Sequence, residues 1–522
     1  MVKNNNPHKI PPPTPWGWET YILLLQLKIN YTPGSDGIPS VFVKTFRDSL
    51  IVPLTKLYNL SISSGSYPKK FKYNFITPIH KSGSRSDIKN YRGVSKMCIF
   101  AKVLDIIMND KLIEKVSDKI SNCQHGFMKK RSIETNLLEF TNRVLNFMEE
   151  GHQLDVIYLD FAKAFDRVNT DILLDKLSKY GFSGSTLNWF RSYLTNRIQY
   201  VKIENYISRP INVSSGVGQG THCGPTLFVL FINDLPSCLK YVFKLLYADD
   251  VKIFLPIQNV DDHLKIQTDL NYLYDWCKLN MLDLNINKCN MVTFHRIKNP
   301  SLFDYNINNN NLSRVSEITD LGITFDPSLT FVKHIDHAIA KARSMLSFII
   351  RFSKDFKDPY TLKTLYCAFV RSHLEFGSKI WSPYYNIHNK RIESIQKRFL
   401  LFALRHLNWN NGFSLPHYEE RCKLINLDTL ETRRRNLSLL FMFDLINGNI
   451  DAPNLIKLIQ FNSSSVSLRK PRALNIPNHR TNYGKFEPIA RMCSLLNGCQ
   501  CFNNQISRDQ YKRKIITHNC FA

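Results

Sequence analysis

The sequence predicts an α+β protein in which helices surround an antiparallel sheet. Two apolar segments of strand length carry acidic residues at their ends, 155–160 and 242–255, and the second reads as a hairpin. Several longer segments show helical periodicity between and after them. At 522 residues the chain exceeds one ordinary hydrophobic core, so we expect two to four lobes.

The individual elements follow from local patterns in chain order. Residues 75–79 (FITPI) predict a strand ahead of a polar loop that runs to residue 90. Segments with helical spacing of apolar residues are 19–30, 41–62, 101–116, 170–180 and 224–235. A polar tract at 308–311 predicts a boundary, after which 330–406 reads mostly as helix.

The charge balance favours a polyanionic partner. The chain has 69 Lys and Arg against 43 Asp and Glu, a net charge of +26. The helical stretch 330–406 alone holds 14 basic against 5 acidic residues, which concentrates positive charge in one lobe. A surplus of this kind is typical of nucleic-acid binding, although it does not separate an enzyme from a coat protein or from a merely basic surface.

Cysteine usage and the N-terminal segment indicate an intracellular protein. The 12 cysteines show no repeated Cys-x-x-Cys spacing, which favours reduced thiols in the cytosol or nucleus. A cysteine- and histidine-containing cluster near the C-terminus matches no common zinc motif: Cys493, Cys499, Cys501, His518 and Cys520. We find no signal peptide, and the apolar run 21–27 is too short to cross a bilayer.

Paired acids in the predicted hairpin are the most informative local feature. Asp249 and Asp250 occupy a turn where Asn-Gly or Asp-Gly is usual, so the pair adds charge repulsion to poor turn chemistry. A solvated acidic hairpin is the plain alternative. Asp160 ends the other apolar strand, and three such carboxylates can converge on two Mg²⁺ ions that catalyse phosphoryl transfer.

These residues resemble motifs of the reverse transcriptases of non-LTR (LINE-type, jockey-like) retrotransposons. Residues 159–168 (LDFAKAFDRV) resemble the first carboxylate motif, and 247–250 (YADD) resemble the second. Between them, 216–225 (GVGQGTHCGP) resembles the Gln-Gly motif. The order is right, and the likeness extends from 34–39 (GSDGIP) through most of the chain, more weakly after residue 427.

The resemblance implies an RNA-directed DNA polymerase, a nucleotidyltransferase that binds an RNA template, a DNA primer and deoxynucleoside triphosphates. Its cofactor would be a pair of Mg²⁺ ions, with Mn²⁺ as a substitute. Asp160, Asp249 and Asp250 would be the catalytic carboxylates and metal ligands, and Lys288 would protonate pyrophosphate. Substrate-binding residues carried over from the motifs are Lys81, Arg92, Phe161, Phe165, Gln219 and Gly220.

Each of these roles has a physical rationale beside a plainer alternative. Lys81 and Arg92 would hold the triphosphate, because Lys supplies a point charge and Arg a bidentate contact, yet most cations in so basic a chain are solvated. Phe165 would exclude a ribose 2′-hydroxyl by clash, or it could be core. Gln219 would contact the nucleotide or template near the nascent pair, and residues 321–323 resemble the strand that grips the primer.

The implied architecture is a right-hand polymerase with an added C-terminal segment. We expect a leader at 1–29, fingers at 30–150, a palm at 151–310, a thumb at 311–410 and a basic C-terminal extension at 411–522. The reverse transcriptase core would lie at about 70–325. The work of such a protein is expected in the nucleus and cytoplasm, without a membrane.

The sequence also departs from the family pattern. Gly218 and Gly93 stand where proline is usual, so both nucleotide-side loops should be less preorganised. An N-terminal endonuclease, usual in such elements, is not expected in this sequence. Two other readings remain open: a catalytically decayed or domesticated nucleic-acid-binding remnant, and an RNA-dependent RNA polymerase, which the Asp160–Asp166 spacing would suit.

Overall fold

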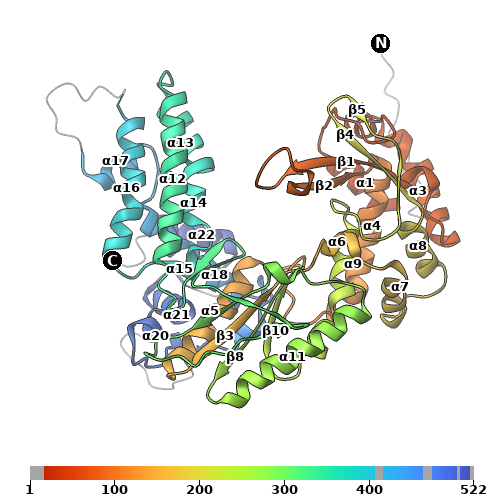
Figure 1. The fold of residues 1–522 in the computed structure, drawn as a ribbon. Coiled ribbons are helices and arrows are strands. Elements are labelled where there is room, and N and C mark those ends of the chain that lie inside the picture. The colour runs from red at the N-terminus through yellow and green to blue at the C-terminus, as the bar shows by residue number, and fades with distance from the viewer. Residues whose placement is uncertain (1–16, 406–415, 463–472, 503–505, 518–522) are drawn as a thin grey trace, which may run out of the picture.

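The computed structural model describes residues 17–405, 416–462, 473–502 and 506–517. The chain forms three groups of elements around an open centre (Figure 1). The N-terminal elements lie on one side, the central sheet lies at the base, and the long helices that follow it lie on the other side. Along these described parts, no helix combines the length and apolar character needed to cross a bilayer.

The central sheet is mostly antiparallel, and its strand order is β12-β9-β3-β8-β7. The bounds are β3 Gln153–Leu159, β7 Phe243–Tyr247, β8 Asp250–Ile257, β9 Asn290–Phe294 and β12 Ser313–Arg314. Successive side chains of β3 enter different cores, because strand residues alternate between faces. Val156 packs with helix α5 (Ile133–Glu149), whereas Ile157 packs with α11 (Val260–Leu279). Helices on both faces explain why both faces of the strand carry buried apolar side chains.

The predicted strands and helices are present with small shifts in their bounds. The expected strand at 75–79 is β1 (Tyr73–His80), and the acid-bearing segments are β3 and the β7–β8 hairpin. Helices expected from periodicity are α1 Gly17–Gln26, α2 Ser40–Thr45, α3 Arg47–Ser64, α4 Ile99–Val116, α7 Thr170–Lys179 and α9 Cys223–Ile232. Helices not expected from the sequence are the long α5 and α11 and the shorter α6 Ala164–Arg167, α8 Gly184–Leu194 and α10 Leu235–Cys238.

A second sheet forms the core of the N-terminal lobe, in the order β2-β1-β4-β5 with β6 on β4. Its remaining strands are β2 Tyr91–Lys96, β4 Arg197–Ile203, β5 Tyr206–Ile207 and β6 Ile211–Val213. Strand β4 pairs in parallel with β1. The palm range expected from the sequence, 151–310, therefore includes three strands that belong to the fingers sheet. Long-range pairing of this kind has no local sequence signal.

The expected leader also contains folded structure. Helix α1 begins at Gly17 and packs against α3 and α4, and its Leu24 is fully buried. The apolar side chains of α1 join the core of the fingers, so the part of the leader from residue 17 onward is better assigned to that lobe. Residues 1–16 lie outside the described residues.

The thumb and the C-terminal extension share one hydrophobic core. Phe399 of α16 (Asn386–Ala403), Leu439 of α18 (Leu430–Ile446) and Met492 of α21 (Pro488–Gly498) are all fully buried in it. Further helices of this part are α12 Val332–Phe352, α13 Pro359–Tyr366, α14 Ser372–Glu375, α15 Ser378–Trp381, α17 Tyr418–Leu424, α19 Pro453–Ile456, α20 Asn482–Lys485 and α22 Arg508–Thr517. The expected boundary at residue 410 therefore does not separate two hydrophobic cores, because residues on both sides of it pack together.

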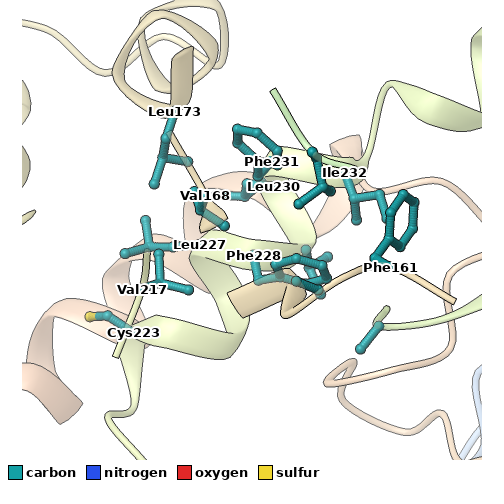
Figure 2. Close-up of a cluster of buried hydrophobic side chains, with 14 of the residues drawn as sticks. Phe161, Val168, Leu173, Val217, Cys223, Leu227, Phe228, Leu230, Phe231 and Ile232 are labelled. Carbon is teal, nitrogen blue, oxygen red and sulfur yellow. The ribbon is translucent and has the colours of Figure 1, made fainter. Parts of the chain in front are cut away.

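Helix α9 is apolar around its whole circumference because it lies inside the palm (Figure 2). Phe228 and Phe231 are fully buried among side chains from the segment that follows β3. Phe161 belongs to this cluster, with only 4% of its surface exposed and its ring near Trp276. The expectation that Phe161 contacts substrate is therefore wrong for the side chain, which serves as core.

Candidate active site

The β7–β8 hairpin carries the paired acids at its turn. Tyr247 pairs with Asp250, so Ala248 and Asp249 form the connecting residues. Ala248 has φ +55°, in the left-handed region that a residue with a β-carbon seldom adopts. The turn is therefore held by its surroundings rather than by turn-forming residues.

A loop that we call the bracing loop, residues 121–126, makes hydrogen bonds to this turn and to the end of β7. The Gln124 Oε1 atom accepts hydrogen bonds from the backbone N–H groups of Ala248 (2.9 Å) and Gly126 (2.8 Å). The His125 N–H donates to the Leu246 carbonyl at 2.9 Å. Gln124 is 2% exposed, so its bonds to the hairpin are shielded from water. Sequence reasoning missed Gln124, because the pairing joins segments more than a hundred residues apart.

Gly126 explains how the loop comes so close. A β-carbon at Gly126 would lie 2.3 Å from the Ala248 nitrogen, which is too close for any residue with a side chain. The loop backbone therefore packs directly on the turn that carries Asp249. Together, Gln124 and Gly126 fix the position of the acidic hairpin from inside the palm.

Asp160 reaches the same site from β3. Leu159 pairs with Val251, so the residue after it lies beside the start of β8, where Asp250 stands. Burial raises the pKa of Asp249, and the charge of Asp160 raises it further. Burial and then the neighbouring Asp249, Asp320 and Asp160 charges raise the pKa of Asp250 to about 6. The three acids thus interact electrostatically across the sheet.

The donor chemistry fits a divalent cation of the Mg²⁺ type. Oxygen-only carboxylate ligands suit a hard ion, and a cation between them would relieve the repulsion that raises their pKa values. In the described part of the chain, no three acidic, histidine or cysteine side chains form a compact preassembled metal centre. The geometry therefore provides candidate ligands whose final convergence depends on the ion and substrate.

A cavity of about 450 Å³ opens beside these acids. Asp160, Asp250 and Lys288 line it together with residues of the β13–β14 hairpin (Ile318–Asp320 and Ile323–Phe325). The Lys288 Nζ atom lies 3.9 Å from Asp160 Oδ2, and both side chains are substantially exposed. Lys288 is therefore beside a carboxylate that it can neutralise and within the cavity where chemistry would occur.

One buried ion pair links the catalytic strand to this hairpin. Lys252 of β8 and Asp320 of β13 form a short hydrogen-bonded pair, with side chains only 4% and 7% exposed. Lys252 also lies 4.7 Å from the centre of the Phe140 ring. This pair fixes the wall of the cavity two residues beyond Asp250.

Two basic residues of the fingers, Lys81 and Arg92, interact electrostatically with Asp249. Lys81 and Arg92 are exposed at the β1–β2 hairpin, where the Lys81 N–H donates to the Asn90 carbonyl at 2.8 Å. Their positive charges oppose the rise in the pKa of Asp249. The hairpin of the fingers therefore faces the acidic hairpin closely enough for their charges to interact.

The Gln-Gly loop joins the palm to the fingers. The Gln219 side-chain amide donates to Asp166 Oδ1 at 3.0 Å, and the Gln219 carbonyl accepts from the Ser95 N–H at 2.7 Å. Gly220 has φ +100°, and a β-carbon there would lie 2.8 Å from the Ser95 carbonyl oxygen. Gly220 thus permits the close approach of the loop to β2, while the Gln219 side chain lies beside Asp166.

Phe165 lies at the edge of the core near the same loop. Its ring stacks on Phe228 with centroids 4.5 Å apart and meets Phe127 edge-on at 6.1 Å. The Val217 N–H donates to the Phe165 carbonyl at 2.8 Å. The ring is only partly buried, so one face is fixed by packing while the rest is open to the site.

Comparison with known proteins identifies this arrangement. The family model "Reverse transcriptase (RNA-dependent DNA polymerase)" matches residues 79–325, which include every candidate site residue from Lys81 to Lys288. Residues 79–325 of the chain therefore form a reverse transcriptase domain. The chain is also similar to RNA-directed DNA polymerases of mobile elements.

Two of the relatives are polymerases of mobile elements from Drosophila melanogaster. The chain is 26% identical over 427 residues to the probable RNA-directed DNA polymerase from transposon BS, covering 78% of this chain and 46% of that protein. It is 27% identical to the RNA-directed DNA polymerase from mobile element jockey, covering 60% of this chain and 35% of that protein. The chain thus spans less than half the length of these relatives.

Among solved structures, the chain is similar to apo telomerase from Candida tropicalis. That match has a TM-score of 0.38 and 12% identity, and it covers 72% of this chain and 66% of that chain.

Proposed function

We propose that this chain is the RNA-directed DNA polymerase of a non-LTR retrotransposon, a transposable element of the LINE type. The observation that carries the proposal is that Asp160 and Asp250 line one cavity, with Asp249 next to Asp250 in the hairpin, inside a reverse transcriptase domain. The RNA template, DNA primer and deoxynucleoside triphosphates would meet in the open centre between fingers, palm and thumb (Figure 1).

The three carboxylates would hold two Mg²⁺ ions, or Mn²⁺ in their place. Bound there, such ions neutralise phosphate charge and lower the pKa of a primer 3′-hydroxyl. Asp160 and Asp249 are the direct ligands we infer first, because Asp160 follows β3 and Asp249 lies in the neighbouring β7–β8 turn, which Gln124 holds through Ala248. Asp250 supplies the third carboxylate at the start of β8.

The surrounding side chains would bind and orient the nucleotide. Lys81 and Arg92 would neutralise the triphosphate, since they already act electrostatically on Asp249 from the fingers. Phe165, held by Phe228 behind it, would exclude a ribose 2′-hydroxyl by steric clash.

The remaining two roles concern the template and the leaving group. Gln219 and Gly220 would contact the nascent pair, because they lie on a loop fixed to both fingers and palm. Lys288 would deliver a proton to the departing pyrophosphate from its position beside Asp160. We place this work in the nucleus and cytoplasm, where a chromosomal primer and the element's transcript are found.

Nucleotide choice tests the proposal against its rivals. A labelled DNA primer annealed to an RNA template is incubated with the full chain, Mg²⁺ and either deoxynucleotides or ribonucleotides. Extension with deoxynucleotides, at least about a hundredfold faster than with ribonucleotides, supports a reverse transcriptase with a steric wall at Phe165. Preference for ribonucleotides would indicate an RNA polymerase. Template binding without any extension would indicate a decayed, binding-only remnant.

A further inference from the structure

A second cavity, of about 780 Å³, lies between the thumb helix α16 and the C-terminal helices α17, α18 and α21. It shares no lining residue with the catalytic cavity. Six basic side chains line it: Lys390, Lys397, Lys423, Arg434, Arg435 and Arg491. Four acidic side chains also line it: Glu393, Glu419, Asp428 and Glu431. The cavity therefore has a basic surplus within a lobe that is itself basic.

Arg434 is the most unusual of these side chains, because it is 2% exposed. Its Nη2 atom donates to Asn389 Oδ1 at 2.8 Å, whereas its buried Nη1 atom has no hydrogen-bond partner. A guanidinium group has five N–H donors. Burying one of these donors without a hydrogen-bond acceptor costs free energy. An acceptor in the cavity beside Arg434 would satisfy this atom.

A second arginine reinforces the positive charge. Arg491 of α21 lines the same cavity, and its Nη2 atom donates to the Lys379 carbonyl. Burial lowers the pKa of Arg491 to about 10, and although Glu487 opposes the shift, the Arg434 charge adds to it. Among the described residues, neither arginine forms an ion pair with a carboxylate. The buried Arg434 and the partly exposed Arg491 thus repel one another.

Two of the carboxylates near the arginines, Glu393 and Glu487, are engaged elsewhere. Glu393 accepts hydrogen bonds from the Tyr418 hydroxyl and from the Glu431 N–H. Glu487 caps α21 by accepting from the N–H groups of Ile489 and Ala490, each at 2.7 Å. These acids moderate the field around the arginines without filling the open donor positions. An anion with several acceptor oxygens would supply the hydrogen-bond partner that the Arg434 Nη1 atom lacks.

We propose that this cavity binds a phosphate group of the RNA on which the polymerase acts, through Arg434 and Arg491, with Lys390 and Lys397 at its rim. The proposal rests on the proposed function, because a polymerase bound to a long RNA has strand beyond its catalytic cleft. Guanidinium groups match phosphate geometry, and the exposed lysines continue the basic surface of α16. The site anchors RNA by its backbone without reading its sequence.

The direct test compares two adjacent arginines. Arg433 precedes Arg434 on α18 but pairs with Glu375 and does not line the cavity, so Arg433→Gln is the matched control. Single-stranded RNA binding to the full chain is measured by fluorescence anisotropy across a salt series. We expect Arg434→Gln to weaken binding about tenfold and to reduce the salt slope by about one. The control should stay within about twofold. Equal affinities for Arg434→Gln and Arg433→Gln would overturn the proposal.

Two further arms guard against misfolding and against a free-phosphate site. If Arg434→Gln fails to fold, the exposed pair Lys390→Gln and Lys397→Gln carries the same prediction with a smaller, about threefold, effect. In a thermal-shift measurement, inorganic phosphate should raise the Tm of wild type, at matched ionic strength, but not that of Arg434→Gln. Stabilisation by phosphate with unchanged RNA affinity would overturn the assignment to RNA.

The same binding measurement is repeated in the Asp249→Ala background. The phosphate site predicts the same dependence on Arg434 there, because the two cavities share no residue. If wild type extends no primer but its RNA affinity still depends on Arg434, only the polymerase proposal is contradicted. Normal extension with no Arg434 dependence would contradict only the phosphate site.

Discussion

The palm and the C-terminal extension each hold like charges close together, but with opposite signs. In the palm, the charge of Asp160 adds to the rise in the pKa of Asp249, and the charges of Asp249 and Asp160 add to the rise in the pKa of Asp250. In the extension, Arg434 adds to the depression of the pKa of Arg491. Protein interiors seldom retain such charges without a partner, so the sign of each cluster indicates what is absent. A cation fits the first and an anion fits the second.

In contrast to these two clusters, Lys252 and Asp320 are buried charges of opposite sign that form an ion pair. Both side chains are less than 10% exposed, and they hydrogen-bond directly across β8 and β13. The comparison teaches that this protein neutralises buried charge internally where it only supports structure. It leaves charge unneutralised where a ligand is expected.

Breaking the neutralised pair should have the largest effect on stability. Lys252→Met leaves Asp320 buried without its cation, at a cost of about 3–5 kcal/mol. The unfolding midpoint in urea should fall sharply, and primer extension should fall with it. The double variant Lys252→Met, Asp320→Leu should recover most of the stability. A single variant as stable as wild type would show that the pair does not hold the cavity wall.

Removing the brace behind the acidic hairpin should affect activity more than stability. Gln124→Ala removes the acceptor for the Ala248 N–H, so Asp249 can shift, and extension should fall about 10- to 100-fold. The matched control is Gln267→Ala, which removes two equivalent bonds to Asn306 away from the hairpin. Equal losses of extension in the two variants would indicate a general folding defect instead.

Neutralising one catalytic acid should stabilise the metal-free protein modestly. The pKa of Asp250 is raised from 3.8 to about 6, so folding favours its protonated form, and this stability is lost as pH rises from about 4 through 6. Asp250→Asn mimics the protonated form. In EDTA its Tm should exceed that of wild type by about 1–3 °C at pH 8 and match it near pH 4. A lower Tm than wild type at pH 8 would contradict the repulsion between these acids.

Local patterns predicted much of the palm but little of what supports it. The strands β3, β7 and β8 could be predicted because helices cover both faces of the sheet and make most of their residues apolar. The acids could be predicted because they violate turn chemistry. Gln124 could not, since its partner Ala248 is 124 residues away in sequence.

Other features depend on packing that a linear sequence does not display. Phe161 stands beside Asp160 in the motif, yet its ring enters the core while the acid faces the cavity. Strand β4 joins the fingers sheet by long-range parallel pairing with β1. Packing alone separates an ion-paired Arg433 from the adjacent, buried and partly unpartnered Arg434.

The central claim concerns metal-dependent copying at the acidic hairpin, and a Mg²⁺ titration of primer extension tests it most directly. Wild type, Asp249→Ala and the control Asp304→Ala, an exposed acid outside the cavity, are compared on one RNA template. The account predicts Mg²⁺-dependent extension by wild type and the control, and a loss of roughly a thousandfold or more in Asp249→Ala. Extension by Asp249→Ala at the wild-type rate, or extension unaffected by EDTA, would contradict it.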